Sequence, residues 1–243
     1  MSKNITPYKD SELGKKKQVE QVFDAISDGY DNLNRVISLG SDVKWKKKIV
    51  DLIKKKNPSS ILDVATETGD LAIMLSEIKD AEIKGVDISE GMLKVGRKKV
   101  ENKKLSDRIT LTQADSENLP FEDNHFDVIT VAYGIRNFEN LEKGLSEMLR
   151  VLKPGGTFVI LETSVPTEFP FKQGYKIYCR FILPFIGKMF SKDKKAYGYL
   201  SESASNFPFG KALNNILSEI GFIEVEDKPQ MFGAATIYIA SKK

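Results

Sequence analysis

The chain has 243 residues, 41% of them hydrophobic and 29% charged, which is ordinary for a soluble globular protein. This length suits one sizeable α/β domain and is short for two. The formal net charge of +3 gives no global field that would indicate nucleic-acid binding. A single cysteine, Cys179, excludes an internal disulfide and a cysteine-rich zinc site, and a single histidine, His125, excludes a histidine-based metal cluster. No metal is therefore expected.

The start of the chain lacks the apolar core of a signal peptide. No stretch approaches the ~20 apolar residues that are needed to span a bilayer. We therefore expect a cytoplasmic protein. Three lysine runs each suggest a solvated helix face, but together they leave contact with anionic lipid open; they lie at residues 15–17, 46–48 and 54–56.

Hydrophobic spacing predicts helices first and then alternating strands and helices. The first helix is indicated by Val19, Val22, Phe23 and Ile26, and a second is expected over 42–56, before Asn57-Pro58. Five short apolar runs predict strands at 60–65, 82–87, 109–114, 126–132 and 157–161. Helical patterns lie between them at 70–78, 89–102 and 140–152, and a turn at 154–156 starts the fifth strand.

The C-terminal part breaks this alternation. Residues 212–220 predict a helix, and 222–226 and 236–240 predict two strands joined by a connection that contains Pro229 and Gly233. This hairpin would add an antiparallel strand to a sheet that strand–helix–strand crossovers make mainly parallel. We expect a single domain, 1–243, with an N-terminal helical segment (1–57) and a helical cap (166–209) over the ligand edge of the sheet.

Polar residues follow the predicted strands at the edge where open α/β sheets bind ligands. Asp87 ends the second strand and suits a ribose diol, because a carboxylate can accept two hydroxyl hydrogen bonds. Asp115, after the third strand, suits an amino donor such as that of adenine. These aspartates also have structural explanations. Asp87, like Asp63 in the first strand, could cap a helix, and Asp115 could sit in a turn. Their order favours a nucleoside cofactor. The residues leave NAD and S-adenosylmethionine open, although the first turn lacks a glycine-rich pyrophosphate loop.

These segments resemble the successive motifs of class I S-adenosylmethionine-dependent methyltransferases, at 63–70, Asp87, Asp115 with Leu119-Pro120-Phe121, and 152–156. Further segments resemble the ubiquinone/menaquinone biosynthesis C-methyltransferases: Tyr30-Asp-Asn-Leu-Asn34 with Ser38-Leu-Gly40 and Trp45-Lys46, Gly134-Ile-Arg-Asn137, and Leu161-Glu-Thr-Ser-Val-Pro166. The resemblance runs from about Val19 to the C-terminus. It implies a Rossmann-like α/β fold with a mainly parallel seven-stranded sheet, a C-terminal antiparallel hairpin and a helical cap.

The resemblance also implies the cofactor contacts, position by position. Thr68, beside Gly69, would lie at the methionine end of S-adenosylmethionine, Asp87 on its ribose, and Asp115 with Ser116 near its adenine.

One position departs from the pattern, because the family has glycine where Glu67 stands. Glycine permits unusual backbone angles and close approach to a ligand. Glutamate adds bulk and negative charge near the expected cofactor carboxylate, so weaker cofactor binding is expected.

The implied reaction is transfer of the methyl group to a ring carbon of a prenylated quinol, most simply demethylmenaquinol to menaquinol, which leaves S-adenosylhomocysteine. A deprotonated hydroquinone is nucleophilic at carbon, and the sulfonium is already activated, so no metal is required. Arg136 is the main candidate for holding the oxyanion, and Asn137 could orient it. Tyr30 and Asn34 could line the ring pocket. Alternatively, Arg136 could pair with Glu162 and Tyr30 could simply pack in the core.

The aromatic residues of the predicted cap are core in the simplest interpretation. They could also hold a polyprenyl tail, with basic residues facing phospholipid at the inner face of the cytoplasmic membrane. The apolar set is Phe169, Phe171, Tyr175, Ile177, Tyr178, Phe181, Ile182, Phe185, Met189 and Phe190, and the basic set is Lys172, Lys176, Arg180 and Lys188.

Two other functions remain open at this stage. One is a related small-molecule or lipid methyltransferase, and the other is a non-catalytic protein of the same fold whose cofactor binding is impaired by Glu67. A nucleic-acid methyltransferase is disfavoured by the near-neutral charge. The sequence leaves open whether the acceptor is a naphthoquinol or a benzoquinol, the prenyl length, and the oligomeric state, including a homodimer.

Overall fold

A computed structural model describes residues 5–183, 186 and 194–243. Among these residues, seven strands form one sheet in the order β3-β2-β1-β4-β5-β7-β6. The first five strands in this order run parallel to one another. β7 is antiparallel to both of its neighbours, β5 and β6. The mainly parallel sheet with a C-terminal antiparallel hairpin is thus confirmed. The strands are β1 (Ser60–Val64), β2 (Glu82–Asp87), β3 (Ile109–Gln113), β4 (Phe126–Ala132), β5 (Leu152–Thr163), β6 (Ile223–Gln230) and β7 (Ala235–Ser241).

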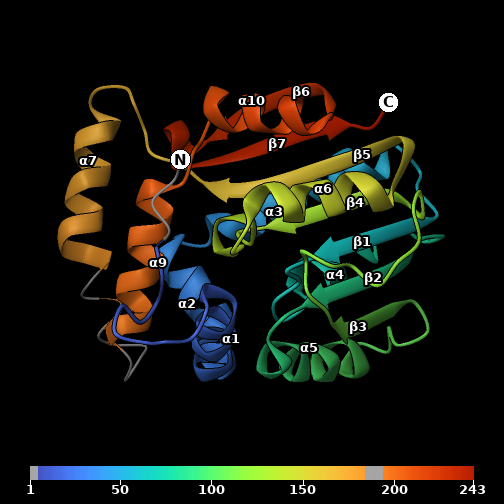
Figure 1. The fold of residues 1–243 in the computed structure, drawn as a ribbon, viewed down its shortest axis with the longest axis horizontal. Coiled ribbons are helices and arrows are strands. Elements are labelled where there is room, and N and C mark those ends of the chain that lie inside the picture. Colours follow the sequence, from blue (N-terminus) through green and yellow to red (C-terminus); the bar gives the residue numbers. More distant parts are fainter. Residues whose placement is uncertain (1–4, 184–185, 187–193) are drawn as a thin grey trace.

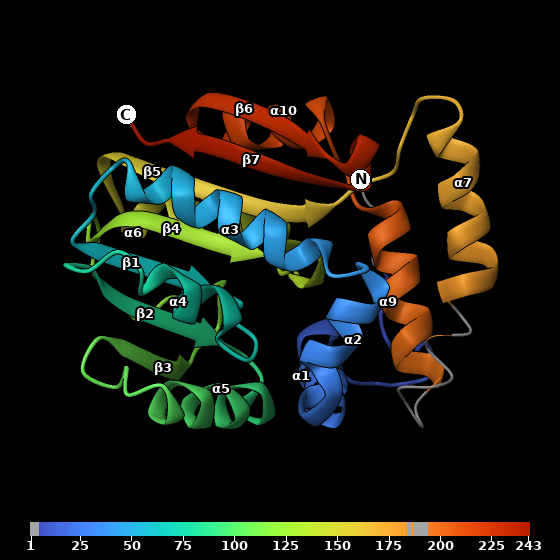
Figure 2. The same cartoon turned by 180° about the vertical axis from the view of Figure 1, so that it is seen from behind.

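Helices cover both faces of the sheet, as Figures 1 and 2 show from opposite sides. On one face, Ile49 and Leu75 pack against sheet residues such as Ile61. On the other face, Leu145 and Leu217 join a second cluster of buried apolar residues. Apolar strands buried on both faces explain why the parallel strands are near-continuous hydrophobic runs in the sequence. The first layer contains α3 (Ser41–Lys54), α4 (Asp70–Leu75) and α5 (Glu90–Asn102), and the second contains α6 (Leu141–Val151) and α10 (Lys211–Ile220).

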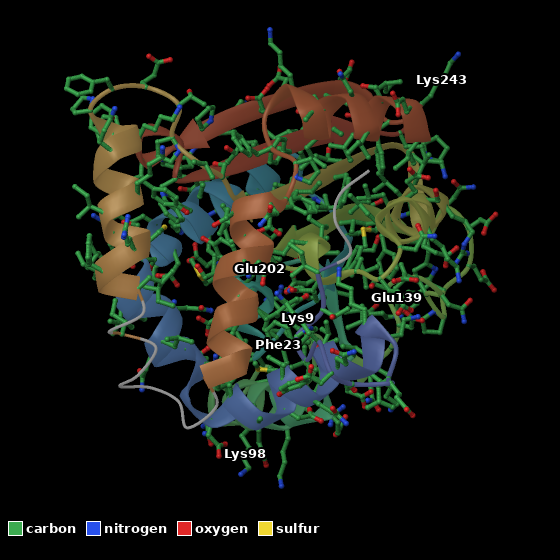
Figure 3. The ribbon with its side chains drawn as sticks, turned by 60° about the vertical axis from the view of Figure 1, so that its left-hand side comes forward. Lys9, Phe23, Lys98, Glu139, Glu202 and Lys243 are labelled. Atoms are coloured by element: carbon green, nitrogen blue, oxygen red, sulfur yellow. The ribbon has the colours of Figure 1, made fainter. Side chains whose placement is uncertain are left out.

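In the described ranges, six further helical elements lie beyond the carboxyl ends of the parallel strands. The arrowheads of β1, β2 and β4 point toward them (Figure 2). A third buried cluster, which includes Phe23, Tyr30, Met92 and Tyr199, joins the N-terminal helices to α5 and α9. Figure 3 shows Lys9 near Glu202 of α9, an ion pair of 3.4 Å. These elements are α1 (Lys15–Ile26), η1 (Ser27–Gly29), α2 (Tyr30–Ile37), α7 (Phe171–Ile177), the π-helical η3 (Tyr178–Ile182) and α9 (Lys194–Asn206).

The described part of the predicted cap is therefore helical and stands at the ligand edge of the sheet, with α7 on the outside (Figure 1). Four of the cap residues singled out from the sequence lie outside the described residues: Phe185, Lys188, Met189 and Phe190. None of the helices in the described part of the chain is long and apolar enough to cross a membrane.

Two strand boundaries were wrong in the sequence-based prediction. β5 starts at Leu152, before the expected turn, because Leu152 pairs with Phe126 across a register shift and Gly155 takes a φ of +74°. A bulge of this kind keeps the strand paired while it bends. β6 continues through Pro229, which pairs with Thr236 instead of lying in the connection. A proline is tolerated there because β6 is at the edge of the sheet, where its missing N–H breaks no ladder.

Candidate active site

A small cavity of about 60 Å³ lies beyond the carboxyl ends of β1 to β4 and is closed on one side by α1. Its lining includes Asp87 at the end of β2, Asp115 and Ser116 after β3, and Gly134 and Asn137 after β4. Three of the predicted cofactor residues therefore lie together, because neighbouring parallel strands end at the same edge.

The carboxylate of Asp87 is almost fully buried and is held by the backbone. It accepts hydrogen bonds from the backbone nitrogens of Ser89, at 2.9 Å, and Glu67, at 2.8 Å. The helix cap that the sequence suggested for Asp87 is instead Ser89, whose Oγ accepts a hydrogen bond from the backbone nitrogen of Met92 at 3.1 Å, while Asp87 holds the turn before it. Burial raises the pKa of Asp87 to about 6. Since each carboxylate oxygen can accept two hydrogen bonds, Asp87 can hold this turn and still accept both hydroxyls of a ribose.

Asp115 is engaged by its own turn and by α1. Its Oδ1 accepts a hydrogen bond from the backbone nitrogen of Glu117 at 2.9 Å, as the turn interpretation required. Its Oδ2 lies 2.6 Å from Nζ of Lys16. Lys16 also lines the cavity, together with Phe23 of the same helix. The position of α1 therefore limits the volume at the end where the adenine is expected.

Thr68 and Gly69 are not among the described residues that line this cavity. Thr68 Oγ1 donates a hydrogen bond to Asp31 at 2.5 Å and accepts one from Lys99 at 3.1 Å, which links α2 to α5. Gly69 has a φ of +73°, and a Cβ there would lie 3.2 Å from Leu111. Gly69 thus shapes the turn before α4, and the direct contact of these two residues with the cofactor stays a prediction.

Glu67 lies in the turn after β1 with a φ of +56°, so the unusual backbone angle expected at a family glycine is present. This conformation costs a non-glycine residue ~1 kcal/mol or more. The side chain is 8% exposed and lines the small cavity. Its Oε1 accepts a hydrogen bond from the hydroxyl of Tyr30. Burial raises the pKa of Glu67 to about 8, although the positive charge of Lys46 opposes the shift.

A second cavity, of about 1130 Å³, adjoins the first at Tyr133, which lines both. Its walls come from α2, the loop after β4, the cap, and the connection between β6 and β7. Tyr30, Asn34 and Arg136 line it, so three of the predicted acceptor residues lie together. Asn137 instead lines the small cavity, where its Oδ1 accepts a hydrogen bond from the hydroxyl of Tyr199 at 3.0 Å.

Arg136 is fixed by a buried ion pair. Its Nη1 lies 2.6 Å from Oε1 of Glu162, with side chains only 7% and 1% exposed, and it also donates to the carbonyl oxygen of Tyr133 at 2.5 Å. The pairing with Glu162 considered from the sequence is correct. Within the described residues, three buried polar atoms here have no partner: Arg136 Nε, Glu162 Oε2 and Tyr133 Oη. Buried polar atoms without partners are rare and costly, so this group of atoms is suited to receive a ligand.

Sequence reasoning missed two residues of the site. Tyr133 directly precedes the Gly134-Ile-Arg-Asn137 segment, so its neighbours in the chain could have drawn attention to it. Lys16 carries no such signal, because its contact with Asp115 depends on how α1 folds back over the sheet. Across the part of the chain that is described, no group of three or more His, Cys, Asp and Glu side chains is arranged to hold a metal ion.

Residues 11–242 match the ubiE/COQ5 methyltransferase family. The chain belongs to this family. The demethylmenaquinone methyltransferase of Bacteroides fragilis is 49% identical to it over 240 residues, which cover 98% of this chain and 97% of that relative. The demethylmenaquinone methyltransferase of Porphyromonas gingivalis is 42% identical over 240 residues and 98% of each chain. That of Bacillus cereus is 42% identical over 230 residues, which cover 94% of this chain and 97% of the relative.

Solved structures similar to this ubiE/COQ5 family member share its fold at low sequence identity. A SAM-dependent methyltransferase from Thermotoga maritima, described as a possible histamine N-methyltransferase, has a TM-score of 0.64 at 18% identity and covers 93% of this chain and 100% of its own. Phosphoethanolamine N-methyltransferase 2 of Haemonchus contortus in complex with S-adenosyl-L-methionine has a TM-score of 0.55 at 18% identity, over 76% of this chain and 48% of its own. The fold is thus that of S-adenosylmethionine-dependent methyltransferases.

In this family member, Asp87 and Asp115 line the small cavity together with the apolar side chains of Ile88 and Ala114. A buried carboxylate such as that of Asp87 can accept hydrogen bonds from the hydroxyls of a ribose. Tyr133 lines both cavities, so the two spaces lie on either side of one residue.

Proposed function

We propose that this methyltransferase transfers a methyl group from S-adenosylmethionine to a ring carbon of demethylmenaquinol, giving menaquinol and S-adenosylhomocysteine. The observation that carries the proposal is that one residue, Tyr133, lines both the small cavity that holds Asp87 and the large cavity lined by Arg136. Demethylmenaquinone methyltransferases 42–49% identical over nearly the whole chain support a naphthoquinol acceptor over a benzoquinol.

When bound, S-adenosylmethionine supplies a methyl group that its sulfonium already activates. Arg136 stabilises the negative charge of the acceptor's deprotonated hydroxyl, which spreads onto the ring carbon. Glu162 and the carbonyl oxygen of Tyr133 both accept hydrogen bonds from Nη1 of Arg136. These contacts fix the orientation of Arg136 before the acceptor binds. Tyr30 and Asn34 of α2 line the same cavity and contact the ring of the acceptor.

The size and mouth of the large cavity suit a prenylated acceptor. At about 1130 Å³ it exceeds the ~300–1,000 Å³ of common small-molecule sites, which leaves room for isoprene units beside the ring. Three of its lining residues are also strongly exposed, Leu39 at 74%, Phe232 at 66% and Met231 at 49%. The prenyl tail leaves the protein between these side chains.

The surface around this mouth suits contact with a membrane. Five further apolar side chains of the described cap segment are exposed: Phe169, Phe171, Ile177, Phe181 and Ile182. Basic residues stand among them, and the guanidinium of Arg180 lies 5.7 Å from the ring centroid of Phe181. Apolar side chains flanked by cations bind anionic bilayers. The protein accordingly takes its acceptor from the inner face of the cytoplasmic membrane.

The function is tested with the purified full chain, methyl-labelled S-adenosylmethionine and demethylmenaquinol carrying a short prenyl chain. Mass spectrometry of the quinone is expected to show one added methyl group on the ring, and a prenylated benzoquinol is expected to react more slowly. Cells that lack the protein should accumulate the demethylated quinone. A chain that binds S-adenosylmethionine and methylates neither quinol would contradict the proposal, and a chain that fails to bind it would favour a non-catalytic member of the fold.

A further inference from the structure

One buried hydrogen bond connects the two cavities. The hydroxyl of Tyr30 donates to Oε1 of Glu67, and the two side chains are 3% and 8% exposed. Tyr30 lines the large cavity and Glu67 lines the small one. We propose that Glu67 accepts, through Tyr30, the proton that the acceptor's hydroxyl loses during methyl transfer. This inference rests on the proposed function and adds to it the proton acceptor, which the chemistry of Arg136 alone leaves unassigned.

Both partners of this hydrogen bond are held in place. The backbone nitrogen of Glu67 donates to Oδ2 of Asp87 at 2.8 Å, which anchors the turn from which the carboxyl projects. The ring of Tyr30 packs edge-on against Phe23, with centroids 5.9 Å apart and planes at 76°.

The charges around Glu67 allow it to exist in either protonation state near neutral pH. Lys46 of α3, Tyr30 of α2 and Arg136 after β4 favour the carboxylate, whereas Asp87 of β2 disfavours it. Tyr133 is also close enough to interact. Burial is the largest effect and raises the pKa to about 8. A positively charged cofactor in the same cavity lowers that value toward neutrality, and a proton acceptor works best when its pKa is near the working pH.

Two proton transfers accompany the methyl transfer. The acceptor's O–H bond breaks and its proton passes to the oxygen of Tyr30, while the proton of Tyr30 passes to Oε1 of Glu67. The two transfers are concerted, because burial raises the pKa of Tyr30 well above its usual range and opposes a free tyrosinate. The electron pair released on the acceptor oxygen moves into the ring, and the ring carbon forms a bond to the methyl group. The carbon–sulfur bond breaks and its pair stays on sulfur. The ring carbon then loses its own proton to water, the electron pair of that bond returns through the ring to the oxygen, and Glu67 gives its proton back through Tyr30 to that oxygen, which restores the quinol.

The central test is Glu67→Gln, which keeps the shape and size of the side chain and removes its basicity. We expect its kcat to fall by about tenfold or more, since positioned proton transfer contributes ~10²–10⁴-fold. Cofactor affinity by calorimetry should stay within about threefold. In the parent, kcat should rise with pH to a plateau through an apparent pKa at or below about 8, and the variant should lack this rise. Glu147→Gln, outside the site, is the matched control and should keep the parental pH profile.

Two further variants separate a proton acceptor from a packing residue. Tyr30→Phe should remove the same pH-dependent rise, and combining it with Glu67→Gln should add little, because both interrupt one path. Glu67→Gly should bind S-adenosylmethionine more tightly, since glycine adopts the φ of +56° without strain and clears the cavity. Its kcat should lie between those of the parent and Glu67→Gln, because the vacated space admits a water that can take the proton.

A direct readout does not depend on turnover. Infrared difference spectra of the ligand-free protein should show one buried carboxyl that loses its proton near pH 8, and Glu67→Gln should lack this signal. The inference is overturned if that signal persists in Glu67→Gln, or if this variant keeps the parental kcat and pH profile. Absence of methyl transfer by the parent chain is a different outcome, since it overturns the proposed function and the inference with it.

Discussion

The carboxylate of Asp87 holds the backbone of two turns, and replacing Asp87 tests its proposed second role, which is to bind the cofactor's ribose. Asp87→Ala removes charge-assisted hydrogen bonds to the ribose that are worth ~1.5–3 kcal/mol each. We expect calorimetry to show S-adenosylmethionine binding at least about tenfold weaker, because 1.4 kcal/mol corresponds to a factor of ten.

Asp127→Ala is the matched control. Asp127 accepts hydrogen bonds from the backbone of Ser59 and Ser60 at the amino end of β4, so its loss should lower stability and spare cofactor affinity. Unchanged affinity in a folded Asp87→Ala protein would remove this assignment.

Arg136 is expected to act on the acceptor and not on the cofactor, since it lines the large cavity. Arg136→Lys keeps the charge but loses the planar guanidinium, whose Nη1 donates to both Glu162 and the Tyr133 carbonyl. Turnover should fall by about fivefold or more, and the affinity for the cofactor should change little. Arg150→Lys, which alters an ion pair with Glu147 away from both cavities, controls for general effects of the exchange. Turnover of Arg136→Lys within about twofold of the parent is the result that contradicts the role.

Single residues could be predicted from the sequence where their function follows from position along one strand. Asp87 and Asp115 end neighbouring strands, and parallel strands bring their carboxyl ends to one edge. The contact between Lys16 and Asp115, the hydrogen bond from Tyr30 to Glu67, and the unpaired hydroxyl of Tyr133 could not be predicted in this way. They depend on how α1 and α2 pack over the sheet, and no local pattern records that packing.

At the scale of elements, the turns after β1 and β4 touch at Gly134. A Cβ at this position would lie 2.4 Å from Cβ of Ala65, which is closer than real Cβ atoms approach. Gly134→Ala is therefore expected to destabilise the fold by about 1–3 kcal/mol through overpacking. Gly174→Ala in α7 is the matched control, because its Cβ meets no atom of the described residues within 4 Å, and alanine favours helix. Urea denaturation of both variants measures the difference. Equal stability would mean that the two turns move apart at little cost.

The cap segment carries the proposed membrane contact. Phe169 and Phe181 are 80% and 64% exposed, and replacing both with serine removes apolar area without disturbing the buried core. Co-sedimentation with vesicles that contain anionic lipid should fall by about tenfold or more, at roughly 25 cal/mol for each Å² of apolar surface no longer buried. Ile223→Ser, at an exposed position on β6, should leave vesicle binding unchanged. If the parent chain binds no vesicles, with or without anionic lipid, the membrane contact is wrong.

Element boundaries were predictable where a hydrophobic run ended at a clear turn, as for β2 and β4. They failed where pairing overrode the local signal. Pro229 suggests the end of a strand, yet an edge position accepts it, and only the sheet order reveals that β6 is an edge. Gly155 suggests a turn, yet it permits a bulge within a continuous β5.

For the whole molecule, the alternation of strands and helices was sufficient to predict the parallel sheet, because its crossovers have one favoured hand. The large cavity was not predictable in size or shape. It forms where α2, the cap and the connection between β6 and β7 face one another, and these segments are far apart in the sequence. The rings of Phe171 and Phe232 are an example of a contact between such distant segments. Their centroids are 3.6 Å apart, yet the hydrophobic spacing of the sequence singles out neither residue.

Buried carboxyls with raised pKa values, which include Asp63 as well as Glu67 and Asp87, should make the stability of the ligand-free molecule depend on pH. Burial raises the pKa of Glu67 from 4.5 to about 8 and that of Asp87 from 3.8 to about 6. Between these ordinary and raised values the native state holds protons that the unfolded chain has lost. The free energy of unfolding should therefore fall as the pH rises from about 4 to about 8, and level off above that.

The interval from about pH 7 to pH 8 reports mainly on Glu67, since Asp87, with a pKa of about 6, is largely ionised there. One proton gives a slope of at most about 1.4 kcal/mol per pH unit. Urea denaturation at half-unit steps should show this decline in the parent and a nearly flat curve in Glu67→Gln, whose amide does not titrate. Saturating S-adenosylmethionine should also reduce the slope, because its positive charge favours the carboxylate in the native state. Parallel curves for the parent and Glu67→Gln would mean that Glu67 is ionised in the folded protein at neutral pH.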